Sequence, residues 1–390
     1  MRPLMRRRIM QGSVNLEFFR TALLSLGASF LAGCASFANP GPMPASGHGS
    51  VHEILPALAE HHRVCNVVVA VVRNRKLHSI DSASGCKAAR PPGPDSVFQA
   101  ASLSKPLFAH AVLLLAKEGR IELEAPVMRY LPEGYLHRYA PLEAEPSELV
   151  TDHRLNAITV RMALNHTSGL PNWSSGPLRF DTAPGAKWDY SGEGYVFLQR
   201  AVEAVTGQPL DRFMASGIFQ SLGMQHSDYV LGPRIARDLV PGTKANGAPR
   251  ATIEMTSPVA AFSLHTTAND YARFLVAVLA DQPSVDVITA SPVTVDAKLD
   301  LGWGLGWGIA RERDDTLIWQ WGNNPGYRAF VIASVRSGDG MVMLTNSENG
   351  LKLAEPLTRR ILPGEHALFR SAVMGTDVLT MLCNGLKLCL

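Results

Sequence analysis

Two residues three positions apart, Ser102 and Lys105, have the spacing best suited to chemistry in this sequence. A serine hydroxyl is a weak nucleophile at neutral pH unless a base stands within hydrogen-bond reach of it. Residues three apart share one face of a helix, and partial burial disfavours the ammonium form of lysine. Lys105 can therefore act as the base for Ser102. A lone S-x-x-K motif arises by chance about once in a chain of this length, so the pair needs support from other motifs.

Two further motifs follow along the chain. Tyr190-Ser191-Gly192 precedes a predicted helix, and Gln320-Trp321-Gly322 closes a β-rich segment. In this order and separation, the three motifs resemble those of the class C β-lactamase, penicillin-binding protein and esterase superfamily of serine hydrolases. The resemblance covers roughly residues 60 to 360, and the joint pattern is far more specific than any one motif. It extends to the surrounding segments Leu164–Leu170, Pro184-Gly185, Leu222–Met224 and Gly304–Gly308.

The resemblance implies a role for each matching residue. Ser102 would be the nucleophile, Lys105 its proton acceptor, and Tyr190 the residue that relays protons and activates the deacylating water. Because the free pKa of tyrosine is about 10, the Lys105 ammonium would have to favour the phenolate or share its proton. The backbone N–H groups of Ser102 and Asn323 would form the oxyanion hole. Substrate would contact Gly192, Gln320, Trp321, Gly322, Asn324 and Arg328.

Two departures from the family pattern bear on the substrate. The second motif usually ends in asparagine, where this chain has Gly192, and the third usually begins with lysine or histidine, where it has Gln320. Without a cation at Gln320 the site has less to attract the carboxylate of β-lactams and peptidoglycan stems, although Arg328 could partly replace it. Ester or peptide acyl transfer then fits better than β-lactam hydrolysis, and the acyl group stays open. The alternative is a catalytically silent relative that binds an envelope component.

The elements that must position these residues alternate between strands and helices. An N-terminal hairpin is predicted at 66–72 and 76–81, and the Ser102 helix runs to about Glu118 before Gly119. Helices are then predicted at 158–165, 194–205 and 268–279, the last with Thr267 in a capping box. Short β-runs follow at 305–309, 316–321, 328–335 and 341–345, and a final helix at 351–360, capped by Asn346 and Ser347. We expect an α+β fold: an antiparallel sheet from both ends of the chain, flanked by helices, with an inserted helical region and the site in the cleft between them.

The N-terminus has the architecture of an export signal. Five arginines precede the apolar run 21–30, which is too short to span a bilayer and leads into Leu31-Ala32-Gly33-Cys34. This sequence resembles the bacterial lipobox, so we expect a signal peptide at 1–33, a lipid anchor on Cys34 and a flexible tether at 34–50. The alternatives are a plain secretory signal and translation from Met10. The hydrolase domain is expected at 51–365, followed by a tail at 366–390, in a lipoprotein of the cell envelope, with the outer membrane compatible with Ala35.

Charge and cysteine usage narrow the remaining function classes. Removing residues 1–33 takes the formal charge of the chain from +3 to about −1, so no basic face for nucleic acid is expected. Export permits disulfides: Cys65 and Cys86 flank the predicted hairpin and could bridge its open end, whereas Cys383 and Cys389 could pair only if Gly385 turns the chain. His61, His62 and Cys65 lack further ligands at matching spacing, so we expect no metal and no cofactor. His166 is interpreted as a turn histidine bonded to backbone rather than a general base.

Overall fold

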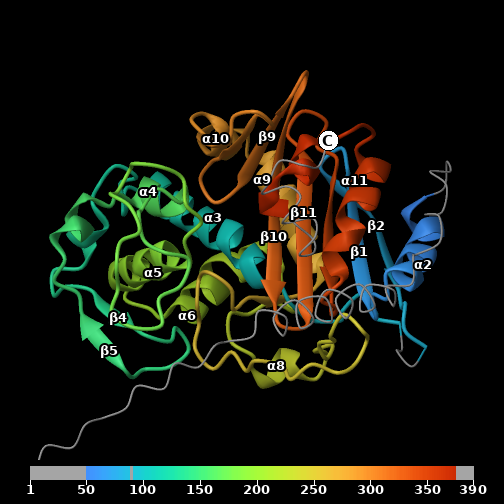
Figure 1. Cartoon of the computed structure of the whole chain (residues 1–390), viewed down its shortest axis with the longest axis horizontal. Helices are drawn as coiled ribbons and strands as arrows, with labels where there is room; N and C mark the ends of the chain where they lie inside the picture. Colours follow the sequence, from blue (N-terminus) through green and yellow to red (C-terminus); the bar gives the residue numbers. More distant parts are fainter. Residues whose placement is uncertain (1–49, 88–90, 375–390) are drawn as a thin grey trace, which may run out of the picture. The chain divides into compact units, whose positions relative to one another are not determined.

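An eight-stranded antiparallel sheet forms the centre of the fold, and both ends of the described chain contribute strands to it. In the computed structural model the strand order is β2-β1-β12-β11-β10-β9-β8-β7, so the N-terminal hairpin lies beside the C-terminal meander (Figure 1). The α+β architecture expected from the sequence is therefore confirmed. The strands are β1 (Val67–Arg73), β2 (Lys76–Ala83), β7 (Val293–Asp296), β8 (Leu301–Trp303), β9 (Gly308–Glu312), β10 (Asp315–Asn324), β11 (Tyr327–Ser334) and β12 (Gly340–Thr345).

The structure describes residues 50–87 and 91–374. The expected signal peptide, Cys34, nearly all of the tether, Met10, Cys383 and Cys389 lie outside the described residues. Within the described ranges, no helix is both long and apolar enough to cross a bilayer.

Helices pack on both faces of the sheet. Strand β1 shows why, because its alternate residues point to opposite faces. Val67, Val69 and Val71 face α2 (Val51–His61) and α11 (Ala354–Ile361). Val68, Ala70 and Val72 face the larger core, which includes α3 (Ser104–Lys117) and α9 (Ala268–Ala280). A strand buried on both faces reads as a continuous apolar run, as β1 does.

The segment between β2 and the meander holds the helical region. Its helices begin at polar caps: the side chains of Thr159, Ser191 and Thr267 each accept a backbone N–H of the first turn. Gly207 ends α5 in the left-handed conformation, as the sequence predicted. The elements are β3 (Phe98–Gln99), β4 (Leu136–Arg138), β5 (Ser147–Leu149), α4 (Val160–Leu164), α5 (Gly192–Thr206), α6 (Leu210–Met214), α7 (Gln220–Leu222), α8 (Pro233–Ala236), β6 (His265–Thr266) and α10 (Gln282–Thr289).

Several local expectations need correction. The predicted strand 305–309 is shifted, because the glycine-rich segment divides between β8, a turn and β9. Asn346 does not cap α11: its side chain accepts the Asn66 N–H and donates to the Pro241 carbonyl, so it ties the N-terminal hairpin to the C-terminal segment instead. Helix α2 and strand β7 had no counterpart in the prediction. The core also extends beyond residue 365, because Leu368 and Met374 are buried in it.

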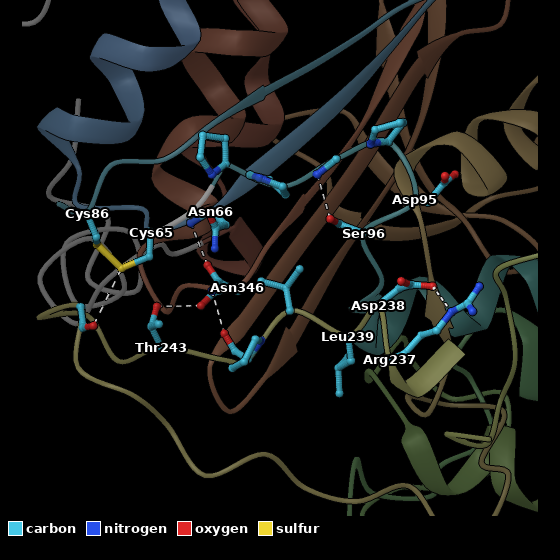
Figure 2. Close-up of a pocket in the computed structure, with 17 residues that line it drawn as sticks. Cys65, Asn66, Cys86, Asp95, Ser96, Arg237, Asp238, Leu239, Thr243 and Asn346 are labelled. Carbon is cyan, nitrogen blue, oxygen red and sulfur yellow. Dashed lines mark hydrogen bonds and ion pairs between the residues drawn. A yellow bond between two sulfur atoms is a disulfide. The ribbon is translucent and has the colours of Figure 1, made fainter. Parts of the chain in front are cut away.

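Cys65 and Cys86 form a disulfide across 21 residues, as the sequence suggested. It closes the end of the β1–β2 hairpin, at the edge of the sheet, and lies beside Asn66 and Asn346 (Figure 2). A cavity of about 720 Å³ adjoins it, lined also by Asp95, Arg237 and Asp238. None of the predicted catalytic or substrate-binding residues lines this cavity.

Candidate active site

Ser102 and Lys105 meet at the start of α3, although Ser102 is not itself in the α-helix. It lies in a short 3₁₀ turn, Ala101–Leu103, that leads into the helix. Lys105 Nζ lies 3.2 Å from Ser102 Oγ and donates to the Ala261 carbonyl at 2.9 Å. The lysine is only 1% exposed, and this burial lowers its pKa to about 7. A neutral amine is therefore available to accept a proton near neutral pH.

The turn that presents Ser102 is held in a rare backbone conformation. Ala101 has φ +50°, in the left-handed region that costs a residue with a side chain roughly 1 kcal/mol. The Ser104 hydroxyl secures the turn, since it donates to the Ala101 carbonyl at 2.6 Å and accepts the Leu264 N–H at 3.0 Å. Strained backbone conformations of this kind are common at active sites, where the surrounding structure holds them in place.

Strand β10 approaches this turn closely because Gly322 has no side chain. A Cβ at that position would meet the Ala100 carbonyl oxygen at 2.4 Å. Gln320, two residues earlier, is fully buried. Its Nε2 donates to the Ser102 carbonyl at 3.2 Å and to the Tyr190 hydroxyl at 3.3 Å. Gln320 of the third motif is therefore hydrogen-bonded to one residue of each of the other two motifs.

Tyr190 lies between Lys105 and Trp321. Lys105 Nζ is 4.7 Å from the centre of the tyrosine ring, and the Tyr190 hydroxyl is hydrogen-bonded to Ser102 as well as to Gln320. Burial raises the pKa of Tyr190 well above 10, and the two hydrogen bonds offset this only in part. With the pKa of Lys105 lowered to about 7 and that of Tyr190 raised, Lys105 is partly a neutral amine and Tyr190 is a phenol near pH 7. Of the two alternatives expected from the sequence, burial therefore disfavours the phenolate and leaves the sharing of a proton between Tyr190 and Lys105.

His166 supports Tyr190 and stays neutral. It is fully buried at φ +61°, and its Nδ1 accepts the Ser191 N–H at 3.0 Å. The imidazole lies 4.2 Å from the Tyr190 ring, centre to centre. Burial, followed by the charge of Lys105, lowers the pKa of His166 well below 6.5. The interpretation of His166 as a turn histidine bonded to backbone is confirmed.

The register of β10 places the Asn323 N–H at an open edge. Strand β9 stops pairing with β10 at Trp319, and the Trp321 N–H is taken by the Gln320 side chain rather than by a strand. Residues two apart in a strand point the same way, so the Asn323 N–H leaves β10 on that same edge. Asn323 and Ser102 both line one cavity of about 370 Å³. The two amides can thus serve as donors to an oxyanion there.

The predicted substrate-contacting residues divide into two groups. Trp321 and Asn324 line the cavity with Ser102 and Tyr190, whereas Gly192, Gln320, Gly322 and Arg328 do not. Arg328 donates to the carbonyls of Asn324 and Tyr327, so it supports the loop after β10 and does not replace a substrate-binding cation. A Cβ at Gly192 would meet the Asn172 carbonyl at 2.6 Å and the Trp173 ring at 2.7 Å. Gly192 therefore allows the opposite wall of the cavity to pack closely.

That opposite wall went unrecognised in the sequence. It consists of Asn172 and Trp173, with Phe262 and Pro325 completing the lining. Trp173 packs edge-on against Phe262, with ring centres 5.2 Å apart. Asn172 and Trp173 lie just after the family-like segment Leu164–Leu170, separated from it by Pro171. This position in the sequence was the one available indication that they belong to the site. No lysine, arginine or histidine lines the cavity among the described residues, so the walls are aromatic and amide groups.

Comparison with known proteins agrees with this geometry. The family model described as Beta-lactamase matches residues 51–365. The chain therefore belongs to the β-lactamase family, whose relatives here include an esterase and penicillin-binding proteins. This family is a class of serine hydrolases. The chain has the fold of that class, and its three motifs differ from the usual pattern at Gly192 and Gln320.

The individual relatives differ in how much they cover. Esterase EstB of Burkholderia gladioli is 36% identical over 177 residues, 37% of this chain, and the match spans 41% of the esterase. Penicillin-binding protein 4* of Bacillus subtilis is 24% identical and is covered over 75% of its length, with 81% of this chain. D-alanine carboxypeptidase AmpC of Burkholderia cenocepacia shares the fold with a TM-score of 0.63 at 18% identity, over 75% of this chain and 91% of that one.

Proposed function

We propose that this protein hydrolyses neutral carboxylic esters through an acyl-enzyme on Ser102. The observation that carries the proposal is the buried Lys105 amine 3.2 Å from the Ser102 hydroxyl, with its pKa lowered to about 7. An amine that is partly neutral at physiological pH activates a hydroxyl that would otherwise be a poor nucleophile.

The steps follow from the site geometry. As Ser102 Oγ attacks the ester carbonyl carbon, its proton passes to Lys105 Nζ, and the Ser102 and Asn323 N–H groups receive the oxyanion. The Tyr190 hydroxyl then gives its proton to the leaving alcohol and is reprotonated from the Lys105 ammonium. In the second half, water attacks the acyl-enzyme carbonyl as it passes a proton through Tyr190 to Lys105. The bond to Ser102 Oγ then breaks, Lys105 returns that proton to Oγ, and the acid is released. Each oxyanion-hole donor contributes about 3 kcal/mol to transition-state stabilisation in enzymes of this kind.

The cavity lining favours a neutral substrate. Gln320 is buried and bonded to Tyr190 and Ser102, and Arg328 is engaged by backbone carbonyls. The described lining residues include no cation that could bind a substrate carboxylate. Trp173, Trp321 and Phe262 provide apolar surface for an acyl or alkoxy group. The similarity to an esterase points in the same direction.

Intact mass spectrometry combined with turnover assays tests this function. The wild type, Ser102→Ala and the exposed-serine control Ser216→Ala are incubated with p-nitrophenyl butyrate, a penicillin and a cephalosporin. We expect the wild type and Ser216→Ala to turn over the ester, with Ser102→Ala inactive. A lasting penicilloyl adduct would instead indicate a penicillin-binding role, and rapid β-lactam turnover a β-lactamase. No adduct and no turnover would favour the binding-protein alternative.

We also propose that the mature protein is lipid-anchored through Cys34 in a bacterial envelope. The lipobox-like Leu31–Cys34 segment supports this. Labelled palmitate should enter the wild type and be lost in Cys34→Ala, with Cys383→Ala as the control. Equal labelling of all three proteins would exclude an anchor at Cys34.

A further inference from the structure

A fully buried histidine, His137, lies between two carboxylates behind the wall formed by Asn172 and Trp173. It belongs to the hairpin of β4 and β5, where it pairs with Glu148. His137 Nε2 lies 3.3 Å from Glu193 Oε2, and its Nδ1 lies 3.9 Å from Glu148 Oε1. Among the described residues, neither ring nitrogen has a hydrogen-bond partner, and Glu193 Oε2 has none either. The histidine therefore lies against these two side chains without a hydrogen bond to either.

Each carboxylate also holds one end of the same loop. Glu193 Oε1 accepts the Ser174 N–H at 3.0 Å, and Glu148 Oε1 accepts the Leu178 N–H at 2.6 Å. The loop 172–178 between these contacts begins with Asn172 and Trp173, which line the Ser102 cavity. Hydrogen bonds to a charged acceptor are about twice as strong as neutral ones. The position of the loop thus depends on both glutamate side chains.

His137 lies between the two carboxyl groups, with one ring nitrogen toward each. Glu193 is 1% exposed, and a buried charge without a partner is strongly destabilising. Its place in the first turn of the 15-residue helix α5 favours negative charge there. The other groups facing His137 are the Tyr135 and Tyr139 rings, and Arg138 and Arg200 act on Tyr135.

We propose that His137 is a positioning residue that sets the substrate specificity of the cavity. Through Glu193 and Glu148 it holds the loop 172–178, and through that loop it places Trp173 against the acyl or alkoxy group. The effect on substrate specificity rests on the proposed esterase function. The role of His137 in holding the loop 172–178 does not depend on that function. The contact from His137 to the cavity wall runs through these two carboxylates and the loop backbone.

Hydrogen–deuterium exchange of the loop tests the holding role without any substrate. In His137→Phe, amide exchange over 172–178 should accelerate by about tenfold or more, the size expected for a lost charge-assisted hydrogen bond. Glu193→Gln keeps an acceptor for Ser174 but lacks the charge, so its effect should be smaller. The control is His366→Gln, which removes another buried histidine paired with a carboxylate, Glu312, and should leave this loop unchanged.

A double variant separates positioning from general destabilisation. If His137 acts through Glu193, then His137→Phe with Glu193→Gln should accelerate loop exchange less than the product of the two single effects. Should His137→Phe fail to fold, Glu193→Gln decides alone. Unchanged loop exchange in the folded variants would overturn the proposal.

Ester kinetics then test specificity. In His137→Phe the ratio of kcat/KM for p-nitrophenyl butyrate to that for p-nitrophenyl acetate should change by about fivefold or more, mainly through KM, because Trp173 no longer contacts the longer chain. The kcat for the acetate should stay close to that of the wild type. An unchanged ratio alongside faster loop exchange would reject the specificity claim. If the wild type hydrolyses neither ester, the proposed function fails while the exchange result still decides the holding role.

Discussion

At the scale of single residues, the candidate site depends on what burial does to two neighbouring groups. Lys105 loses its hydration and is left with few polar contacts, namely the Ser102 hydroxyl and the Ala261 carbonyl, so the pKa of its ammonium falls toward neutrality. The same burial disfavours the phenolate of Tyr190, and its pKa rises. The two shifts have opposite directions because burial penalises whichever form is charged. They assign the base role to the lysine and a proton-relay role to the neutral phenol.

The pH dependence of ester hydrolysis should reflect this assignment. Because the neutral amine is the active form and its pKa lies at about 7, log kcat/KM should rise with unit slope below pH 7 and level off above it. No further rise is expected up to pH 9, since Tyr190 acts as a phenol. Stopped-assay rates from pH 5 to 9 check this. A rate that still rises between pH 8 and 9 would instead indicate a phenolate base.

Removing the lysine should reveal its cost to stability. The native amine has a pKa of about 7 and the unfolded one about 10.4, so the unfolded chain binds the extra proton between these values and wild-type stability rises with pH there. Lys105→Met lacks this contribution. Relative to the variant, the wild type should gain up to about 1.4 kcal/mol per pH unit from pH 7 to 9.

Urea unfolding of both proteins at pH 7, 8 and 9 measures the difference. The variant should be inactive at every pH, and at pH 7 as stable as the wild type or more so. A stability difference that does not vary with pH would contradict a lowered pKa at Lys105.

At the scale of elements, the site forms where an open strand edge meets a helix start. Strand β10 continues beyond its partner β9, and its last residues face the turn that carries Ser102. The two backbones approach closely only because Gly322 lacks a Cβ. Gly322 thus allows a short distance between strand β10, which carries Asn323, and the turn that carries Ser102.

Gly322→Ala should therefore reduce activity more than its effect on stability alone explains. The added methyl would meet the Ala100 carbonyl at 2.4 Å and force β10 away from the turn. Overpacking of this kind costs about 1–3 kcal/mol. We expect kcat to fall at least about tenfold in protein that is still folded, because a small displacement of an oxyanion donor is expensive. Gly232→Ala, where a Cβ would contact nothing within 4 Å, serves as the control. Equal kcat values in the two variants would contradict this role.

At the scale of the whole molecule, the sheet depends on joining segments that are distant in sequence. Strands β1 and β12 pair with Val67 opposite Thr345, and the side chain of Asn346 bonds both Asn66 and Pro241. The Cys65–Cys86 disulfide lies at the same corner (Figure 2). Neither cysteine lines the Ser102 cavity. The corner contributes to stability and not to chemistry.

Replacing both cysteines by serine should lower the free energy of unfolding by about 3 kcal/mol, the loop-closure value for 21 residues. Urea unfolding of the oxidised wild type and of Cys65→Ser/Cys86→Ser measures this. Ester kcat of the folded variant should equal that of the wild type. A large loss of kcat without loss of stability would show that the disulfide also shapes the site.

Local sequence patterns predicted the Thr267 cap, the hairpin that contains β1 and β2, and the three motifs with their family resemblance. These follow from interactions within a few residues, which spacing and residue type reveal. Only the tertiary structure decided that Gln320 and Arg328 face backbone, that Trp173 and Phe262 wall the cavity, and that His137 lies between Glu148 and Glu193. Most of these depend on contacts between segments that are distant in sequence, such as Gln320 with Ser102 and His137 with Glu193. The protonation of Lys105 and Tyr190 belongs to the same group, because a pKa shift depends on burial, and burial is a property of the packed molecule.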